Sequence, residues 1–172
     1  MKDDFVMPIL VLALICMFMS GALAVVNNIT YPVISEAAAF RAEKAQREII
    51  PEADGFVLIE ADNLPATIKE VYGTTNNMGF VIVVASPGYG GEIIIMCGID
   101  PDGKIIKSVA LNHEETKGIS DPVFAMQDQY KGKNKNLDGI DSVSGATITS
   151  YAYKNGILDA FLAFETVKGV QQ

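Results

Sequence analysis

An uncharged apolar segment near the N-terminus constrains this chain more than any other feature of its sequence. Residues Phe5–Val26 contain no charged side chain over 22 residues. As a helix, this run would extend about 33 Å at about 1.5 Å per residue. That length spans the hydrocarbon core of a bilayer, which is about 30 Å thick. We therefore expect a membrane-spanning helix at residues 5–26, preceded by a short tail at residues 1–4.

The same segment has a second interpretation, a cleaved secretory signal. Signal peptides carry an apolar region of about 7–15 residues behind a basic stretch, whereas this run is longer and the first four residues (MKDD) are not clearly basic. The sequence Ala22–Ala24 still resembles a cleavage site, so cleavage stays an alternative to a retained single-pass anchor. Lys2 precedes the helix and the first cation after it is Arg41. Because cations near helix ends set topology, we expect the bulk of the chain on the extracytoplasmic side of the cell (inner) membrane.

Charge and residue types exclude several classes of function. Lys and Arg total 13 against 21 Asp and Glu, which gives a formal net charge of −8. Nucleic-acid binding needs a basic surface, so we expect no nucleic-acid partner. The two cysteines are too few for a disulfide framework, and we expect Cys16 in lipid and Cys97 in a core. A single histidine excludes a three-histidine zinc site, and no metal site is predicted.

Beyond the apolar segment, residues 27–54 have the composition of a helical stalk. They begin with the polar stretch Asn27–Tyr31, and Ile34–Ile50 is rich in helix-forming Ala, Glu, Lys and Arg. Ser35 is a candidate N-cap for this stalk, and Pro51–Gly55 is expected to end it.

Residues 55–172 carry the pattern of one α+β domain. Apolar and β-branched runs predict strands at Phe56–Glu60, Ala66–Tyr72, Gly79–Ala85, Glu92–Ile99 and Lys104–Leu111. Short glycine-containing turns join the last three, which favours antiparallel pairing. Helices are expected near Pro122–Tyr130 and Thr149–Lys168. The predicted fold class is therefore α+β, an N-terminal transmembrane helix followed by a mainly antiparallel sheet covered by helices.

The segment Asp141–Ser150 (DSVSGATITS) carries the most specific chemistry. It holds one acid, one glycine and five hydroxyl side chains directly before the last predicted helix. A helix N-terminus offers unpaired N–H groups and a partial positive charge that suit a phosphate. Serine and threonine are equally typical of an ordinary N-cap loop. On composition alone, a phosphate site and a simple cap both remain open.

The order of these residues resembles the acceptor motif of the FMN-binding domain family, which runs Asp, two variable residues, Ser or Thr, Gly, Ala, Thr. Asp141–Thr147 matches it. The core hairpin of that family is similar to three further segments, Gly88–Ile93, Gly98–Asp100 and Gly103–Ile105. Asn112–Gly118 is similar to its His-x-Glu-Thr-Pro-Gly loop, with Lys117 where proline is commoner. The resemblance covers most of residues 79–165 and, together with one N-terminal span, extends to the G subunits of Rnf ion-translocating electron-transport complexes.

The resemblance implies that FMN is joined covalently to Thr147 through a phosphoester bond, which a flavin transferase forms. Thr147 would be a tether and no residue of this chain would be catalytic. The implied cofactor-binding residues are Ser144, Gly145, Ala146, Thr149, Glu115, Thr116 and Gly118. The implied function is electron transfer as one subunit of an ion-translocating oxidoreductase, without independent catalysis. The implied partners are the other subunits of that membrane complex, the transferase and membrane lipid.

Several alternatives stay open. The complex is either of the Rnf type or a Na+-translocating NADH:quinone reductase, whose C subunit is related. His113 is either a proton donor to reduced flavin or a structural residue. Asp141 either serves the transferase, by recognition or by positioning a metal, or caps the local turn. Competing functions are a non-redox exported module that binds phosphate or another anion, and a hydrolase using Ser144 or Ser150 with His113. The hydrolase lacks a Gly-x-Ser-x-Gly elbow.

Overall fold

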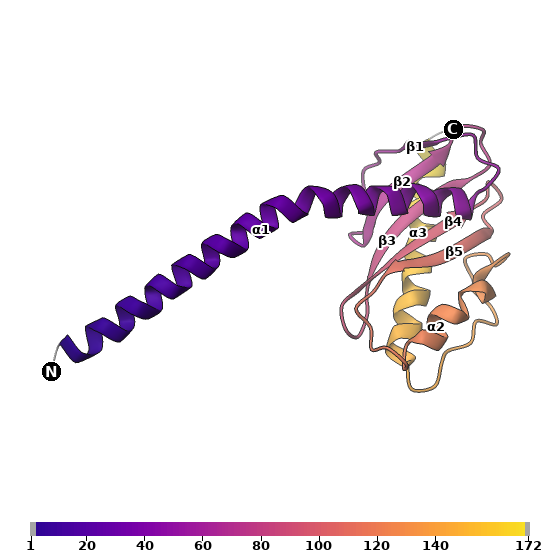
Figure 1. The fold of residues 1–172 in the computed structure, drawn as a ribbon. Helices are drawn as coiled ribbons and strands as arrows, with labels where there is room; N and C mark the ends of the chain where they lie inside the picture. Colours follow the sequence, from indigo (N-terminus) through magenta and orange to yellow (C-terminus); the bar gives the residue numbers. More distant parts are fainter. Residues whose placement is uncertain (1–2, 171–172) are drawn as a thin grey trace. The chain divides into compact units, whose positions relative to one another are not determined.

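The computed structural model describes residues 3–170, which belong to two compact units divided between Ala42 and Glu43. Helix α1 (Asp3–Ile49) begins in the first unit and ends in the second. The second unit contains a five-stranded sheet, two short helices and the long C-terminal helix α3 (Thr147–Val170) (Figure 1). The predicted α+β class with a single N-terminal apolar helix is confirmed.

The first unit is helical and apolar. Its segment Met7–Tyr31, 25 residues with a mean hydropathy of 2.8, is long and apolar enough to cross a membrane. Helix α1 continues without a break through Ser35, so the prediction that Ser35 caps a separate stalk helix is wrong. Helix α1 also continues through the polar stretch before Ser35. There Thr30 Oγ1 donates to the Val26 carbonyl at 2.8 Å, which satisfies the hydroxyl within the helix.

The sheet is a simple antiparallel meander in the order β1-β2-β3-β4-β5. Each strand lies within a few residues of its predicted position, and β1 is shorter than expected. The strands are β1 (Phe56–Leu58), β2 (Ile68–Thr74), β3 (Phe80–Pro87), β4 (Glu92–Ile99) and β5 (Ile105–Asn112). After the sheet come α2 (Asp121–Ala125) and the short 3-10 helix η1 (Gln127–Tyr130), in the place where a single short helix was predicted.

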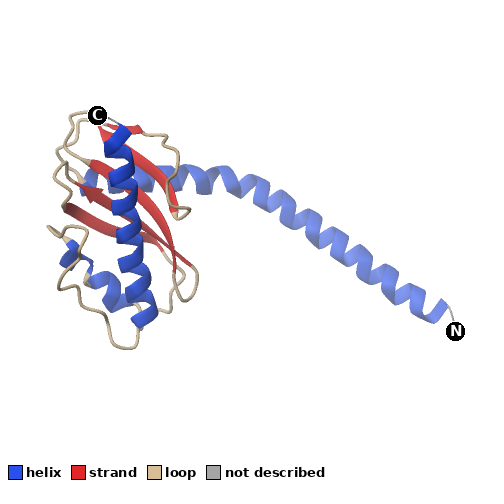
Figure 2. Ribbon diagram, turned by 180° about the vertical axis from the view of Figure 1, so that it is seen from behind, coloured by secondary structure: helices blue, strands red, loops and turns tan. Residues whose placement is uncertain are grey.

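Strands β3 and β4 are buried on both faces. Ile82 and Ile95 belong to the core that includes α3, and α3 lies across this face of the sheet (Figure 2). Side chains alternate along a strand, so Val81 and Met96 point to the opposite face, yet both are fully buried. Burial on both faces explains why these strands are continuous apolar runs in the sequence.

The last turns of α1 pack on that second face. Ala45, Ile49 and Ile50 are buried, and Gly98 of β4 makes room for them, since a Cβ built on Gly98 would overlap the Ile49 side chain. At the rim, Lys107 Nζ lies 2.6 Å from Glu48 Oε1. The end of α1 is therefore part of the folded domain.

Substituting Gly98 by alanine tests this contact. Alanine is ordinarily better than glycine inside a strand, but here the added methyl would overlap Ile49. We expect Gly98→Ala to destabilise the domain by about 1–3 kcal/mol, the usual cost of overpacking, measured as a lower thermal unfolding midpoint of the full-length protein in detergent. Gly169→Ala is the matched control, because a Cβ there meets nothing within 4 Å. Equal midpoints for both variants would contradict the packing described here.

Candidate functional site

A cavity of about 310 Å³ lies where the start of α3 meets two loops of the domain. Figure 2 shows this end of α3, around which the loops and α2 gather. The volume is at the lower end of the range of about 300–1,000 Å³ that is typical of small-molecule sites. The lining residues come from the β3–β4 turn, the loop after β5 and the start of α3, and they are Tyr89, Glu115, Thr116, Ile119, Ser120, Gly145, Ile148 and Thr149.

Four of the residues expected to contact a cofactor line this cavity, namely Glu115, Thr116, Gly145 and Thr149. Ser144, Ala146 and Gly118 are not among the lining residues. Ser144 is exposed in the turn before α3 and Ala146 is buried. Thr147 is exposed at the first residue of α3, directly before Ile148, which does line the cavity.

Sequence reasoning did not identify four lining residues: Tyr89, Ile119, Ser120 and Ile148. Three of them are large and apolar, and each is more than half exposed. Exposed apolar side chains around a cavity are typical of a ligand-binding wall. Tyr89 lies in the glycine-rich segment 88–91, which was predicted as a turn and as part of the hairpin of the family, but not as part of a site.

The start of α3 is built by its own sequence. Gly145 has a φ of +85°, a conformation that favours glycine, and it turns the chain into the helix. Ser150 Oγ donates to the Ala146 carbonyl at 2.9 Å and accepts from the Val143 N–H at 3.0 Å. The N–H groups of Thr147, Ile148 and Thr149 begin the helix and so have no carbonyl partner within it. This arrangement leaves backbone donors available for an anion.

Glu115 joins this helix start to the β3–β4 turn. Its side chain is buried at 6% exposure. The Thr149 hydroxyl donates to Glu115 Oε2, and the Gly90 N–H donates to Oε1 at 2.8 Å. Burial raises the pKa of the Glu115 carboxyl, but the bonds from Thr149 and from the N–H groups of Gly90 and Tyr89, with a smaller contribution from His113, outweigh it. The pKa therefore lies below its ordinary value of 4.5, and the group is a carboxylate at neutral pH.

The lowered pKa gives Glu115 a definite influence on stability as a function of pH. A carboxyl with a depressed folded-state pKa stabilises the fold fully above its unfolded-state pKa, and that contribution is lost as the pH falls through the folded-state pKa. We expect wild type to unfold at a higher temperature than Glu115→Gln near pH 7, with the difference shrinking only below about pH 4.5. Thermal scans across pH check this. Glu114→Gln, one residue away and exposed, should show no such difference, and a gap between wild type and Glu115→Gln that stays constant down to pH 2 would refute the ionised state.

His113 and Asp141 lie outside the cavity lining. The His113 ring stacks on Phe124 with centroids 3.9 Å apart, and its buried Nδ1 has no hydrogen-bond partner among the described residues. The backbone of Asp141 is held by Gln129, whose Oε1 accepts from the Asp141 N–H at 2.9 Å. Within residues 3–170, no hydrogen bond to the exposed Asp141 carboxylate is found. Ser150 Oγ bonds to backbone groups of its own loop, not to His113.

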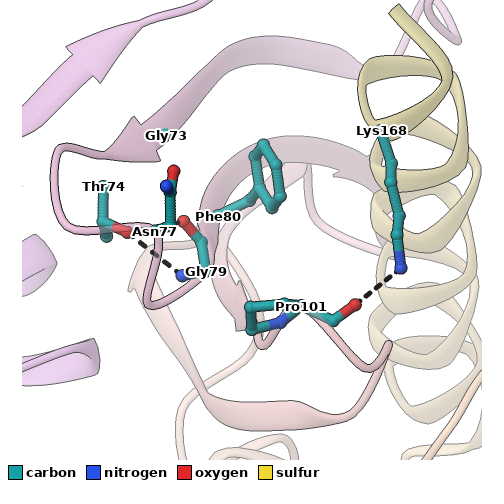
Figure 3. Close-up of a pocket in the computed structure, with 7 residues that line it drawn as sticks. All are labelled: Gly73, Thr74, Asn77, Gly79, Phe80, Pro101 and Lys168. Atoms are coloured by element: carbon teal, nitrogen blue, oxygen red, sulfur yellow. Dashed lines mark hydrogen bonds between the residues drawn. The ribbon is translucent and has the colours of Figure 1, made fainter. Parts of the chain in front are cut away.

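A second cavity of about 240 Å³ lies near the other end of α3 (Figure 3). Lys168 is 21 residues after Thr147 on this helix, which places it about 32 Å away at about 1.5 Å per residue. Its Nζ donates to the Pro101 carbonyl at 2.6 Å, and Thr74 Oγ1 accepts from the Gly79 N–H at 3.0 Å. The Lys168 ammonium and the Thr74 hydroxyl are thus bonded to neighbouring backbone groups, and the acceptor motif is remote from this cavity.

Comparison with known proteins agrees with the position of the first cavity. Residues 88–161 match the model of the FMN-binding domain family, and all eight residues that line the cavity fall in that range. The resemblance to this family, predicted from the sequence, is confirmed.

The chain also aligns with curated relatives over nearly its whole length. It is 29% identical to the G subunit of the ion-translocating oxidoreductase complex of Shewanella piezotolerans, over 98% of this chain and 93% of the relative. It is 28% identical to the G subunit of the proton-translocating ferredoxin:NAD(+) oxidoreductase complex of Clostridium ljungdahlii, over 88% of each chain. It is 27% identical to the G subunit of the Na(+)-translocating ferredoxin:NAD(+) oxidoreductase complex of Acetobacterium woodii, over 86% of each.

Proposed function

We propose that this chain is a membrane-anchored electron-transfer subunit of an Rnf-type ion-translocating complex and that it carries FMN joined to Thr147 by a phosphoester bond. One observation carries the proposal. Thr147 is exposed at the first residue of α3, and two residues close to it on either side, Gly145 and Ile148, line the cavity. The family match supports FMN as the cofactor, and the three relatives support the class of complex.

The residues around the cavity fit FMN. Tyr89, Ile119 and Ile148 offer apolar surface for a flat ring, and the start of α3 offers N–H groups for a phosphate. A Cβ built on Gly145 would meet no atom within 4 Å, so the space beside this part of the cavity wall is unobstructed. Bound FMN supplies one- or two-electron transfer, while the protein supplies position and electrostatics.

Each residue then has a definite task. The Thr147 hydroxyl would hold the phosphate as an ester, and the N–H groups of Ile148 and Thr149 would donate to its oxygens. The Thr149 hydroxyl is already donated to Glu115, so Thr149 would serve the phosphate through its backbone alone. Gly118, with a φ of +82°, shapes the loop that carries Thr116 and Ile119.

The tether is tested by removing the hydroxyl of Thr147. In full-length protein co-expressed with a flavin transferase, we expect wild type to give a fluorescent band on a denaturing gel and an intact mass raised by FMN minus water. Thr147→Ala should lose both signals, because no oxygen remains to form the ester. Thr166→Ala is the matched control, since it removes a threonine hydroxyl near the far end of the same helix. An unmodified mass of the wild-type chain would contradict covalent attachment and would favour an exported anion-binding module.

The side of the membrane is tested with single cysteines and a membrane-impermeant maleimide. Lys131 is exposed in the loop after η1, so Lys131→Cys should react in intact cells. Asp3→Cys, which keeps the Lys2 cation expected to set the topology, should react only after permeabilisation. Wild type should stay unlabelled because Cys97 is fully buried, which raises the pKa of its thiol to about 12, and Cys16 lies in the apolar part of α1. The reverse labelling pattern would place the domain on the cytoplasmic side.

A further inference from the structure

Three segments that are distant in the sequence meet at one side chain, that of Glu115. The carboxylate receives the Gly90 N–H from the β3–β4 turn and the Thr149 hydroxyl from α3, and Glu115 itself belongs to the loop after β5. These segments form the three walls of the cavity. The carboxylate is therefore the point at which the walls are joined.

The turn fits closely against this loop. A Cβ built on Gly88 would overlap Glu115 Oε1, and one built on Gly90 would overlap the Glu114 carbonyl oxygen. Only glycine permits so close an approach of the turn backbone. The position of Tyr89, which lines the cavity between these two glycines, is thus fixed by contact with the 114–115 segment.

The hydrogen bond from the Thr149 hydroxyl to Glu115 also fixes the start of α3. Thr149 lies two residues after Thr147, in the first turn of α3. A carboxylate that accepts from a residue in the first turn is also stabilised by the positive end of the helix dipole. The hydrophobic core that packs α3 on the sheet is made by other residues, so the fold has its own source of stability.

We propose that Glu115 is a positioning residue, whose buried carboxylate fastens the first turn of α3 to the β3–β4 turn and thereby holds Thr147 and the cavity walls in the arrangement that receives the flavin nucleotide. This inference rests on the proposed function. Exchange of the carboxylate for the amide of glutamine leaves one acceptor oxygen for two donors, the Thr149 hydroxyl and the Gly90 N–H. One buried donor is then unpaired, which is destabilising. The loosened walls would then misplace the acceptor hydroxyl.

The first measurement needs no flavin. Amide hydrogen exchange is followed in full-length protein made without the transferase, at Gly90 and at Tyr151–Tyr153, whose N–H groups bond to the carbonyls of the first turn. In Glu115→Gln and Thr149→Val we expect exchange at these amides to rise about tenfold or more, the factor that corresponds to about 1.4 kcal/mol. Glu114→Gln and Thr149→Ser, which keep the carboxylate and the hydroxyl, should exchange like wild type.

The second measurement uses the transferase. The fraction of chains carrying FMN is read from intact mass, and the midpoint potential of the attached flavin from a redox titration. We expect Glu115→Gln to be modified several-fold less than wild type and Glu114→Gln to match wild type. The flavin that Glu115→Gln does carry should have a higher potential, because removal of a nearby negative charge favours the reduced, more negative flavin.

The outcomes separate the two proposals. Wild-type chains without flavin would overturn the proposed function. Normal modification and potential in Glu115→Gln, with a flavin on wild type, would overturn the positioning role alone, and so would unchanged exchange at Gly90 and Tyr151–Tyr153. If Glu115→Gln does not fold, Thr149→Val decides, since it removes one donor and keeps the carboxylate.

Discussion

Burial of β3 and β4 on both faces is the constraint on which the rest of the domain depends. Each face needs a covering layer, and α3 supplies one while the end of α1 supplies the other. The position of α3 along its face is also fixed. Ser86 Oγ donates to the Ala152 carbonyl at 2.7 Å, and a Cβ on Gly156 would come within 2.7 Å of Ile95 Cδ1. Because α3 cannot slide, its first turn must lie beside the β3–β4 turn, where the cavity forms.

Much of this fold was predictable because the strands carry strong local signals. The β-branched run of β3 and the apolar run of β4 each needed burial, and the turns between them contain glycine. Helix boundaries were less predictable. The last helix was expected near Thr149 and begins at Thr147, because the Ser150 N–H donates to the Ala146 carbonyl at 2.9 Å and so makes the first helical hydrogen bond there. A local capping pattern does not reveal this bond. The prediction that a helix begins at Ser35 was wrong, because α1 is uninterrupted there and leaves no unpaired N–H group for the Ser35 side chain to cap.

The site was predictable only in part. The resemblance to a family, and not local chemistry, identified four of the residues that line the cavity, namely Glu115, Thr116, Gly145 and Thr149. The bond between Glu115 and Thr149 joins residues 34 positions apart, and no periodic pattern reports such a pair. Ile119 and Ile148 had no chemical signature in the sequence. They are recognisable as cavity walls only once the fold brings their exposed apolar side chains together.

The start of α3 also explains why a covalent tether is useful in the proposed function. A helix N-terminus attracts anions. One anion, the buried carboxylate of Glu115, already lies beside the first turn of α3, where it accepts from the Thr149 hydroxyl. A phosphate at the start of α3 would be attracted by the backbone N–H groups but repelled by the Glu115 carboxylate. The net charge of −8 on the chain adds to this repulsion. Electrostatic attraction alone would therefore hold a flavin phosphate weakly here. An ester at Thr147 would keep the cofactor in place while the hydrogen bonds of Glu115, which join the cavity walls, stay intact.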